Sequence, residues 1–404
     1  MAGRQREGRV VSSNDGAEFS TSRSHHTWQE IAQADPIPGA YVNARTPSTE
    51  QPKGRAPVLT VHLTQLDEGC VLGVRIAHAL ADAASFQELM RELVAIYNSS
   101  DSPHRRFEFD RNVLLPPDQR SMPREEVETA ITAIGGIPTG QIMGALVTGL
   151  VFGALLPRIM PSTADVPRRM LVRFSGDEVT RLKALASKDL PEGEYISTAD
   201  AIVAHVIRIL GENFPQNNAL TYVLNLRSVL PKFKDPSSDF YFGNALNTIR
   251  VDYPAPTPSL SRREIAQQLR HAMQQQAVPE TIEAKYFVQE NGFRLDCVDA
   301  RKPGFYVNNQ RDLPVYEHRF GDSGVPAMVF PQALGDAILL FPAPPETEPG
   351  GVHVYIEKQF KAVADRERLN TLMHTLDEDA APGAEVAQAG GEGGKSGSLY
   401  PSMD

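Results

Sequence analysis

The stretch "GVRIAHALADAASFQELMREL", from Gly73 to Leu93, carries a His and an Asp where two patterns meet. The residues before His78 alternate with a period of two, which predicts a strand over 71–77. The residues after Asp82 place apolar side chains at helical spacing, which predicts a helix over 84–98. His78 and Asp82 therefore lie on a strand-to-helix connection, where a rigid scaffold presents reactive side chains. A lone His at a strand end is usually structural, so the rest of the chain has to decide.

The composition limits the classes of protein. The chain has 404 residues, of which 41% are hydrophobic, and this length favours two domains. The formal net charge of -10 argues against nucleic acid or an anionic membrane as the main partner. Cys70 and Cys297 form neither a disulfide framework nor a zinc pattern and suit a reducing compartment. The polar start "MAGRQREGRV" is no signal peptide, so we expect a cytoplasmic protein.

One apolar run, Ile142 to Leu156, is shorter than the roughly 18–20 residues that a bilayer span needs. A buried helix or a domain-crossing segment is favoured, with membrane insertion as the alternative.

The second half of the chain also mixes helix and strand signals. Ser175 and Ser261 are each followed three residues later by Glu, which predicts capping boxes. Ser197 is a predicted N-cap, and an alternating strand begins at Val352 with Val352, Val354 and Ile356 inward. We expect two mixed α/β halves joined at about 157–168 and a disordered Gly-rich tail over 379–404.

Three patterns imitate known sites. "AGGEGGKS" in the tail lacks the strand and helix that a phosphate-binding loop needs. Ser323 lies in a Gly-Asp-Ser-Gly stretch, but no nucleophile elbow is present, so a serine hydrolase is a weak alternative. His25 and His26 are adjacent and do not face one site, so no metal site is predicted.

Two further blocks give His78-x-x-x-Asp82 its weight. One has Asn225, Arg227 and the run Tyr241-Phe242-Gly243-Asn244, and the other runs from Arg319 through Phe320 and Gly321 to Gly324. Together, in this order, the three blocks resemble the BAHD acyltransferases, and among them the fungal trichothecene 3-O-acetyltransferase-like branch. The resemblance runs from residue 1 to about 375.

The resemblance implies an α/β (α+β) fold of two domains, of the chloramphenicol-acetyltransferase type, with a central solvent channel. Residues 1–160 would form the domain that carries the His motif, and residues 161–378 would form the other. Acyl-CoA would be the co-substrate, entering from one face, and a small-molecule alcohol or amine would enter from the other. No bound cofactor, metal, nucleic acid or membrane is implied, and a monomer is expected.

The resemblance also implies roles for single residues. His78 would be the general base, which suits an imidazole near pH 7. Asp82 would pair with Arg227 and orient the loop. The loop that carries His78 would be supported by Asn225, Gly243 and Asn244. The CoA channel would be lined by Phe320, Gly321, Gly324 and Asn309.

The chain departs from the family pattern at three places. Ala83 replaces a Gly and would be strained if that position required a positive φ. Arg319 replaces an Asp, and Asp322-Ser323 replaces a Trp. About sixty residues of the family's start have no counterpart, which predicts an open sheet edge and poor solubility.

The sequence thus predicts an acyl-CoA-dependent O-acyltransferase that transfers an acetyl group to a hydroxyl of a secondary metabolite. The alternatives are a truncated or decayed relative that binds ligand without turnover, and an N-acyltransferase or condensation-type enzyme on the same fold. Ala77 stands where condensation domains usually have a second His, which disfavours the last reading. The acceptor and the acyl length are not encoded in any pattern.

Overall fold

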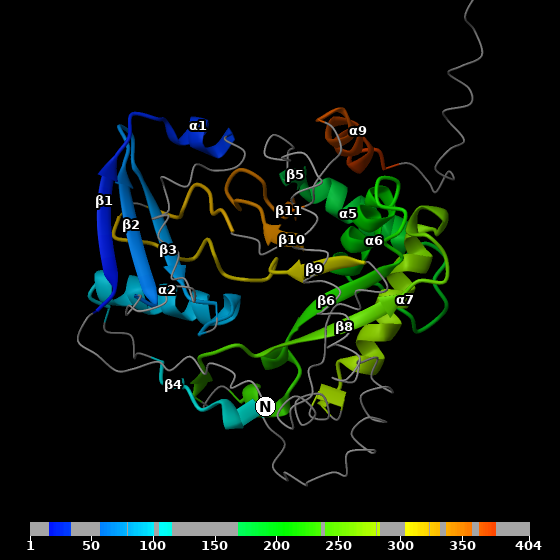
Figure 1. Ribbon diagram of the computed structural model, residues 1–404, viewed down its shortest axis with the longest axis horizontal. Helices are drawn as coiled ribbons and strands as arrows, with labels where there is room; N and C mark the ends of the chain where they lie inside the picture. Colours follow the sequence, from blue (N-terminus) through cyan, green and yellow to red (C-terminus); the bar gives the residue numbers. More distant parts are fainter. Residues whose placement is uncertain are drawn as a thin grey trace, which may run out of the picture. The chain divides into compact units, whose positions relative to one another are not determined.

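A computed structural model gives the structure of the chain (Figure 1). It describes residues 16–33, 57–78, 80–100, 105–114, 169–235, 239–279, 281–282, 304–322, 324–331, 337–357 and 363–376. Within these ranges, no helix is long and apolar enough to cross a membrane. The apolar run 142–156, the predicted joint at 157–168, the boundary after residue 160 and the tail 379–404 all lie outside them.

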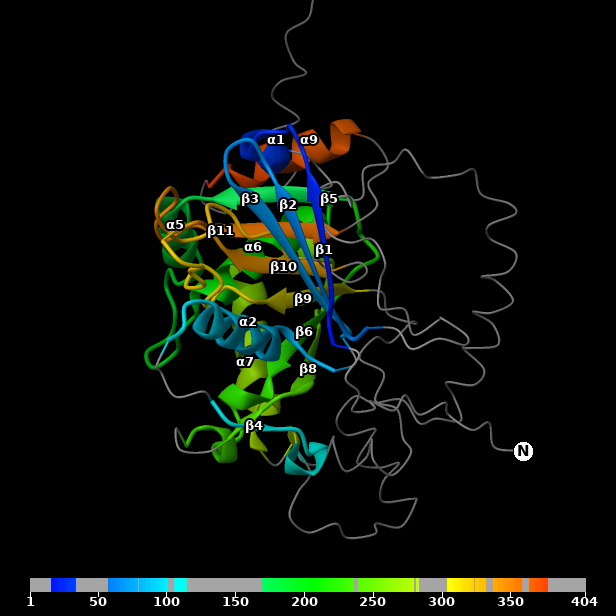
Figure 2. The ribbon, with the colours of Figure 1, turned by 90° about the vertical axis from the view of Figure 1, so that its left-hand side faces the viewer.

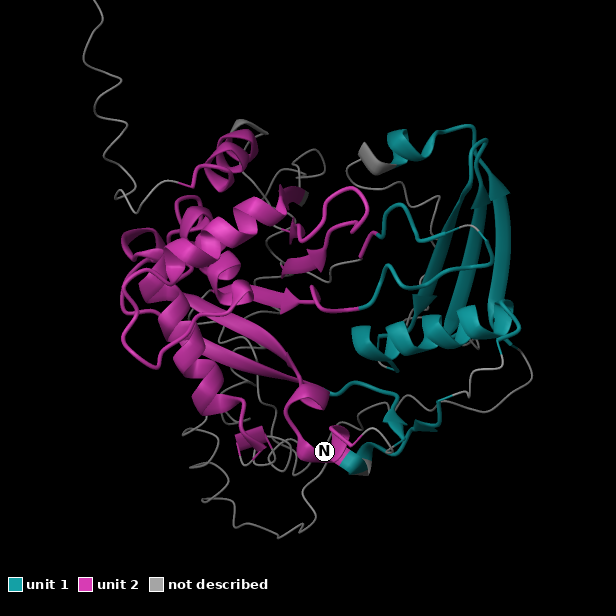
Figure 3. Cartoon of the chain, turned by 180° about the vertical axis from the view of Figure 1, so that it is seen from behind, with its two compact units in different colours: residues 1–113, 236–245, 314–329 teal, residues 114–235, 246–313, 330–404 magenta. Residues whose placement is uncertain are grey.

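The chain forms two compact units, each with helices and strands, as the predicted α/β class requires (Figure 3). Unit 1 combines residues 1–113 with two short segments from later in the chain, 236–245 and 314–329. Unit 2 contains residues 114–235, 246–313 and 330–404. These two segments carry the Tyr241–Asn244 part of the second sequence block and the whole third block, so unit 1 holds most of the predicted site residues.

Unit 1 contains a three-stranded sheet in the order β1-β2-β3 (Figure 2). Its strands are β1 (Glu18–Arg23), β2 (Leu59–Gln65) and β3 (Cys70–Ile76). β1 runs parallel to β2, and β2 pairs with β3 as an antiparallel hairpin. Gly69 ends the hairpin turn with a φ of 104°, a conformation that favours glycine. The two strands predicted beside His78 are confirmed.

The remaining elements of unit 1 are short, apart from one helix. They are α1 (Trp28–Gln33), α2 (Ala83–Tyr97), β4 (Phe107–Glu108), η2 (Arg111–Leu114) and β7 (Phe240–Tyr241). β4 and β7 form a parallel pair, which attaches segment 236–245 to the N-terminal part of the chain.

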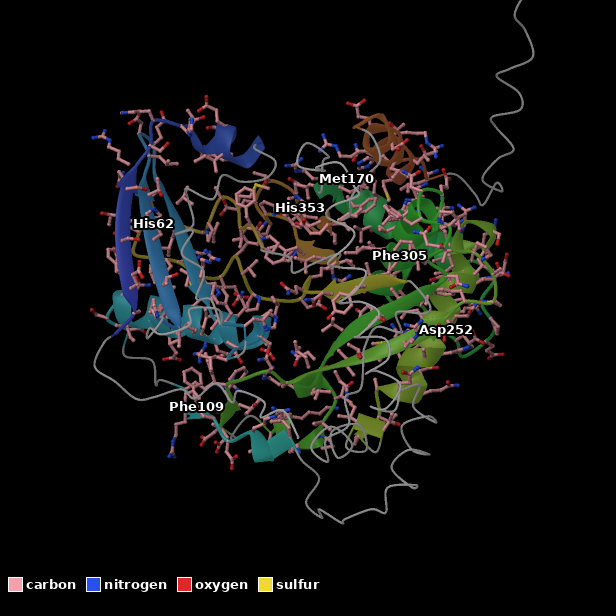
Figure 4. The ribbon with its side chains drawn as sticks, in the orientation of Figure 1. His62, Phe109, Met170, Asp252, Phe305 and His353 are labelled. Carbon is pink, nitrogen blue, oxygen red and sulfur yellow. The ribbon has the colours of Figure 1, made fainter. Side chains whose placement is uncertain are left out.

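The three-stranded sheet buries its polar face. Thr60, His62 and Thr64 of β2 are at most 8% exposed, and His62 is labelled in Figure 4. The other face is apolar and more open, with Leu72 38% exposed and Phe19 63% exposed. Side chains that hydrogen-bond one another tolerate burial, and most of the polar face does so.

Unit 2 is built on a six-stranded sheet in the order β5-β11-β10-β9-β6-β8. Its strands are β5 (Arg169–Phe174), β6 (Ala219–Asn225), β8 (Leu246–Asp252), β9 (Phe305–Asn309), β10 (Ala337–Pro342) and β11 (Val352–Glu357). β11 lies between β5 and β10, so His353 and Tyr355 are buried together with the predicted inward residues. An alternating pattern alone does not show that both faces of a central strand are covered.

Of the four described helices of unit 2, the first three begin where the sequence predicts, and the last was not predicted. They are α5 (Gly176–Ala186), α6 (Thr198–Leu210), α7 (Arg262–Gln276) and α9 (Val363–Met373), with short 3₁₀ turns η3 (Leu226–Ser228), η4 (Pro231–Phe233) and η5 (Thr257–Ser259). Ser175, Ser197 and Ser261 each cap a helix within a complete capping box. α6 and α7 lie together on one side of the sheet (Figures 1 and 2).

A buried histidine joins three of these helices. His205 of α6 is fully buried, and its Nδ1 accepts a hydrogen bond of 2.9 Å from Arg262 Nε of α7. Its Nε2 donates to the carbonyl of Met373 in α9 at 2.9 Å. Burial, reinforced by the Arg262 charge, lowers the pKa of His205 to about 3.

His205 makes the stability of unit 2 depend on pH. Because its folded pKa lies below the unfolded value, the unfolded chain binds the extra proton, and stability is lost as pH falls below about 6.5 by roughly 1.4 kcal/mol per pH unit. His205→Gln can keep both hydrogen bonds without titrating. We expect urea unfolding at pH 7.5, 6.5 and 5.5 to show a smaller loss in the variant than in the wild type. Equal losses would contradict this assignment.

Candidate active site

The carboxylate of Asp82 ties the start of α2 to segment 236–245. Asp82 is the N-cap of α2 and is 2% exposed. Its Oδ1 accepts from Ser85 N at 2.9 Å, and its Oδ2 accepts from Ala245 N at 2.8 Å. The first bond satisfies a helix N–H, and the second reaches a residue far along the chain. One side chain therefore fixes both segments.

His78 lies in the turn that follows β3. The strand end is held by a bond from Ala77 N to Val58 O of 3.0 Å. His78 itself is exposed, and its carbonyl accepts a hydrogen bond of 2.7 Å from Asn244 Nδ2. Asn244 thus holds the backbone of the turn and leaves the imidazole free to act. The first two sequence blocks meet at this point.

Ser85 is a site residue that the sequence reasoning missed. It is fully buried, and its Oγ donates to Gly243 O at 2.9 Å and accepts from Gly243 N at 3.0 Å. A Cβ on Gly243 would lie 2.5 Å from the Tyr241 hydroxyl, so a larger residue would displace that ring. The sequence signal is a Ser three residues after the N-cap in an otherwise apolar stretch.

Ala83 is not strained in the family's Gly position. It is the first residue of α2, and the described non-glycine residues with positive φ are Ser99 and Asp189. The position needs no left-handed backbone, so alanine fits it.

The third block is held at the opposite end of α2. Asn98, which caps the helix, donates from Nδ2 to Arg319 O at 2.8 Å and accepts from Gly321 N at 2.7 Å. The Phe320 ring meets the Tyr97 ring edge to face at 5.5 Å. A helix of 15 residues is about 22 Å long, so this block lies well away from the His78 turn.

Two further features fix the third block. Gly321 and Gly324 have φ of 61° and 79°, which explains glycine at both positions. His318 contacts Gln87 Oε1 through Nε2 at 2.7 Å, and burial lowers the pKa of His318. The role of Phe320, Gly321 and Gly324 in a CoA channel stays a prediction.

Three predicted residues belong to unit 2. Asn225 Oδ1 accepts from Arg227 N at 3.1 Å and from Arg227 Nη1 at 3.3 Å. Asn309 Oδ1 accepts from Arg311 N at 3.2 Å, and Asn309 also bonds Tyr222, whose pKa burial raises to about 12. Asp82 and Arg227 belong to different units, and their pairing stays a prediction.

Two alternatives receive no support from the described residues. The described residues contain no group of three or more His, Cys, Asp or Glu side chains that could hold a metal ion. Ser323, the residue of the hydrolase alternative, lies outside them.

Comparisons with known proteins bear on the family and the fold. Residues 1–145 match the model of the Transferase family. No curated protein matches the chain by sequence. The structure is similar to Fusarium TRI101, recorded as F. graminearum TRI101 complexed with coenzyme A and T-2 mycotoxin, with 16% identity, a TM-score of 0.65 and coverage of 89% of this chain and 81% of that one.

Two other solved structures share the fold. Vinorine synthase has 16% identity and a TM-score of 0.54, with 88% of this chain and 76% of that one covered. The first condensation domain of the CDA synthetase has 16% identity and a TM-score of 0.55, with 93% and 80% covered. At this identity the likeness shows the fold, and it confirms the predicted fold class.

Asp82→Ala should destabilise the protein as well as lower its activity. Losing the N-cap costs about 0.5–2 kcal/mol, and leaving the Ala245 N–H unpaired costs about 1–3 kcal/mol. We expect lower soluble yield and an earlier unfolding transition in denaturant. A variant with normal stability and lost turnover would show that Asp82 acts in the chemistry instead.

Ser85→Ala should destabilise unit 1 by about 1–3 kcal/mol, because the two hydrogen bonds between the buried Ser85 hydroxyl and the Gly243 backbone are lost. The control is Ser259→Ala, since Ser259 is exposed and bonds only a local carbonyl. Urea unfolding of both variants measures the difference. If Ser85→Ala unfolds at the same urea concentration as the wild type, the Ser85–Gly243 hydrogen bonds contribute nothing to the free energy of unfolding.

Proposed function

We propose that this chain is a BAHD-type, acyl-CoA-dependent O-acyltransferase that acetylates a hydroxyl group of a secondary metabolite, supported by the match of residues 1–145 to the Transferase family and by the fold. The observation that carries the proposal is the joining of two distant sequence blocks at His78 and Asp82. The family match and the fold support an acyltransferase independently of that geometry.

The solved neighbours support the two substrates. TRI101 structures hold coenzyme A together with T-2 mycotoxin or deoxynivalenol, and another holds ethyl coenzyme A. By analogy, acyl-CoA is the donor here and a small-molecule alcohol is the acceptor. The predicted cytoplasmic location and monomeric state stay predictions.

The proposed reaction uses His78 as a general base. A neutral imidazole takes the proton of the acceptor hydroxyl as the oxygen attacks the thioester carbonyl, an effect typically of about 10²–10⁴ in rate. The tetrahedral intermediate collapses, the carbon–sulfur bond breaks, and His78 returns the proton to the thiolate. The products are the ester and free CoA, and no acyl-enzyme forms.

Asp82 has a positioning role in this proposal. Both of its carboxylate oxygens accept hydrogen bonds from backbone N–H groups, which ties the carboxylate to the chain on both sides of the turn. Asp82 and Asn244 together fix the turn, and His78 supplies the only side chain of the three that exchanges a proton. In this proposal Asp82 and Asn244 hold the turn in place, and His78 carries out the proton transfer.

One observation favours a second candidate function. Arg319 and Asp322 depart from the family's late signature, which is expected to shape the CoA channel. A relative that binds ligand without turnover would tolerate such changes. A condensation-type enzyme has no comparable support, because Ala77 and not a second His precedes His78.

Calorimetric titration of CoA and acetyl-CoA into the wild type and into His78→Ala tests the proposal without knowledge of the acceptor. We expect micromolar binding of both ligands, unchanged within about twofold in the variant, because His78 acts on the acceptor proton. Circular dichroism of each sample shows whether it is folded. A folded wild type that binds neither ligand would contradict the proposed function.

A further inference from the structure

Two buried polar atoms in unit 1 have no hydrogen-bond partner among the described residues. They are Thr60 Oγ1 and Asn244 Oδ1. A buried polar atom without a partner costs free energy, and most such atoms in folded proteins are paired. An orphaned atom beside a reactive residue is therefore a sign that a substrate supplies the partner.

Asn244 is directly bonded to the His78 turn. Its Nδ2 donates to the His78 carbonyl at 2.7 Å, which fixes the orientation of the amide. The unpartnered atom is therefore an oxygen, and it accepts from an N–H or O–H donor.

Thr60 lies on the polar face of the sheet, next to a row of side chains that hydrogen-bond one another. Ser20 Oγ contacts His62 Nδ1 at 2.8 Å, and Ser22 Oγ contacts His62 Nε2 at 2.9 Å. Ser22 Oγ also bonds Thr64 Oγ1 at 3.0 Å, so this part of the row is internally satisfied. Thr60 and Thr64 lie on the same strand face with 1% exposure each, yet only Thr60 lacks a partner.

Thr60 is also at the His78 end of the row. It pairs with Arg75 of β3, three residues before His78, and because the chain turns at His78 the separation is at most about 10 Å along the chain. The third block, which is expected to shape the CoA channel, is held at the far end of α2. Thr60 therefore lies near the end of the β2–β3 pair that leads into the His78 turn, and Asn244 is bonded to that turn.

We propose that Thr60 and Asn244 bind the acceptor, and that the acceptor is an oxygenated alcohol with a second hydrogen-bonding group at most about 10 Å from the reacting hydroxyl. This inference rests on the proposed acyltransferase function. The Thr60 hydroxyl pairs with a hydroxyl or carbonyl oxygen of the acceptor, and Asn244 Oδ1 accepts from a donor nearer the reacting group. The two residues would set which alcohol is selected.

The matched variants are Thr60→Val and Thr64→Val, which remove one hydroxyl each from the same strand face. Thr60→Val should keep or raise the melting temperature, because it removes an unpartnered buried hydroxyl. Thr64→Val should lower it, because the hydrogen bond between the Thr64 and Ser22 hydroxyls is lost. If Thr60→Val lowers the melting temperature as much as Thr64→Val does, its hydroxyl serves the fold and the proposal is wrong.

The kinetic probes are 3-hydroxy-5α-androstane and its 17-ketone, which differ in a second oxygen far from the hydroxyl. Release of CoA thiol from acetyl-CoA measures turnover. We expect Thr60→Val to lower kcat/KM for the ketone about five- to tenfold, with the simple alcohol and the KM for acetyl-CoA unchanged. An equal effect on both alcohols, no effect on either, or a raised KM for acetyl-CoA would overturn the proposal.

A failure of the proposed function would be seen separately, as a folded wild type that releases no thiol with either steroid. Saturation-transfer NMR then measures binding of the ketone to the wild type and to Thr60→Val without any turnover. Binding that is weakened by Thr60→Val alone supports the site. Absent binding, or binding that is equal in both proteins, overturns it.

Discussion

The site depends on one buried carboxylate. Asp82 accepts a hydrogen bond from the first turn of its own helix and another from Ala245, which is 163 residues away in the sequence. A buried carboxylate needs such partners, because desolvation without them is costly. The same requirement that keeps Asp82 satisfied brings the second sequence block to the His78 turn, so stability and site assembly share one cause.

Unit 1 is consequently a composite. Its own strands end at the His78 turn, but the groups that fix the turn come from residues 243–245, and those that fix the far end of α2 come from residues 318–321. α2 separates these two groups of contacts, with residues 243–245 at its first turn and residues 318–321 toward its other end. Substitutions in either segment therefore act on the site without touching a reactant.

The local part of this architecture was predictable from the sequence. The strand and helix around His78 and the Ser-x-x-Glu boxes at Ser175 and Ser261 follow from period and capping rules that act within a few residues. Ser85 and Asn98 were not predictable, because their partners lie 158 and 221 to 223 residues away. The buried polar face of the sheet was also missed, since alternation predicts an apolar face inward and does not show which hydroxyls bond each other.

The central claim is that Asp82 holds residues 243–245 against the His78 turn, and hydrogen exchange tests it most directly. Exchange is followed by mass spectrometry in the wild type and in Asp82→Ala, with peptides from α6 as the internal control for folding. We predict that peptides covering 77–86 and 240–246 lose protection together in the variant, while α6 keeps its own. Unchanged protection at Gly243 and Ala245 in a folded Asp82→Ala would contradict the account, because those amides would then not depend on the carboxylate.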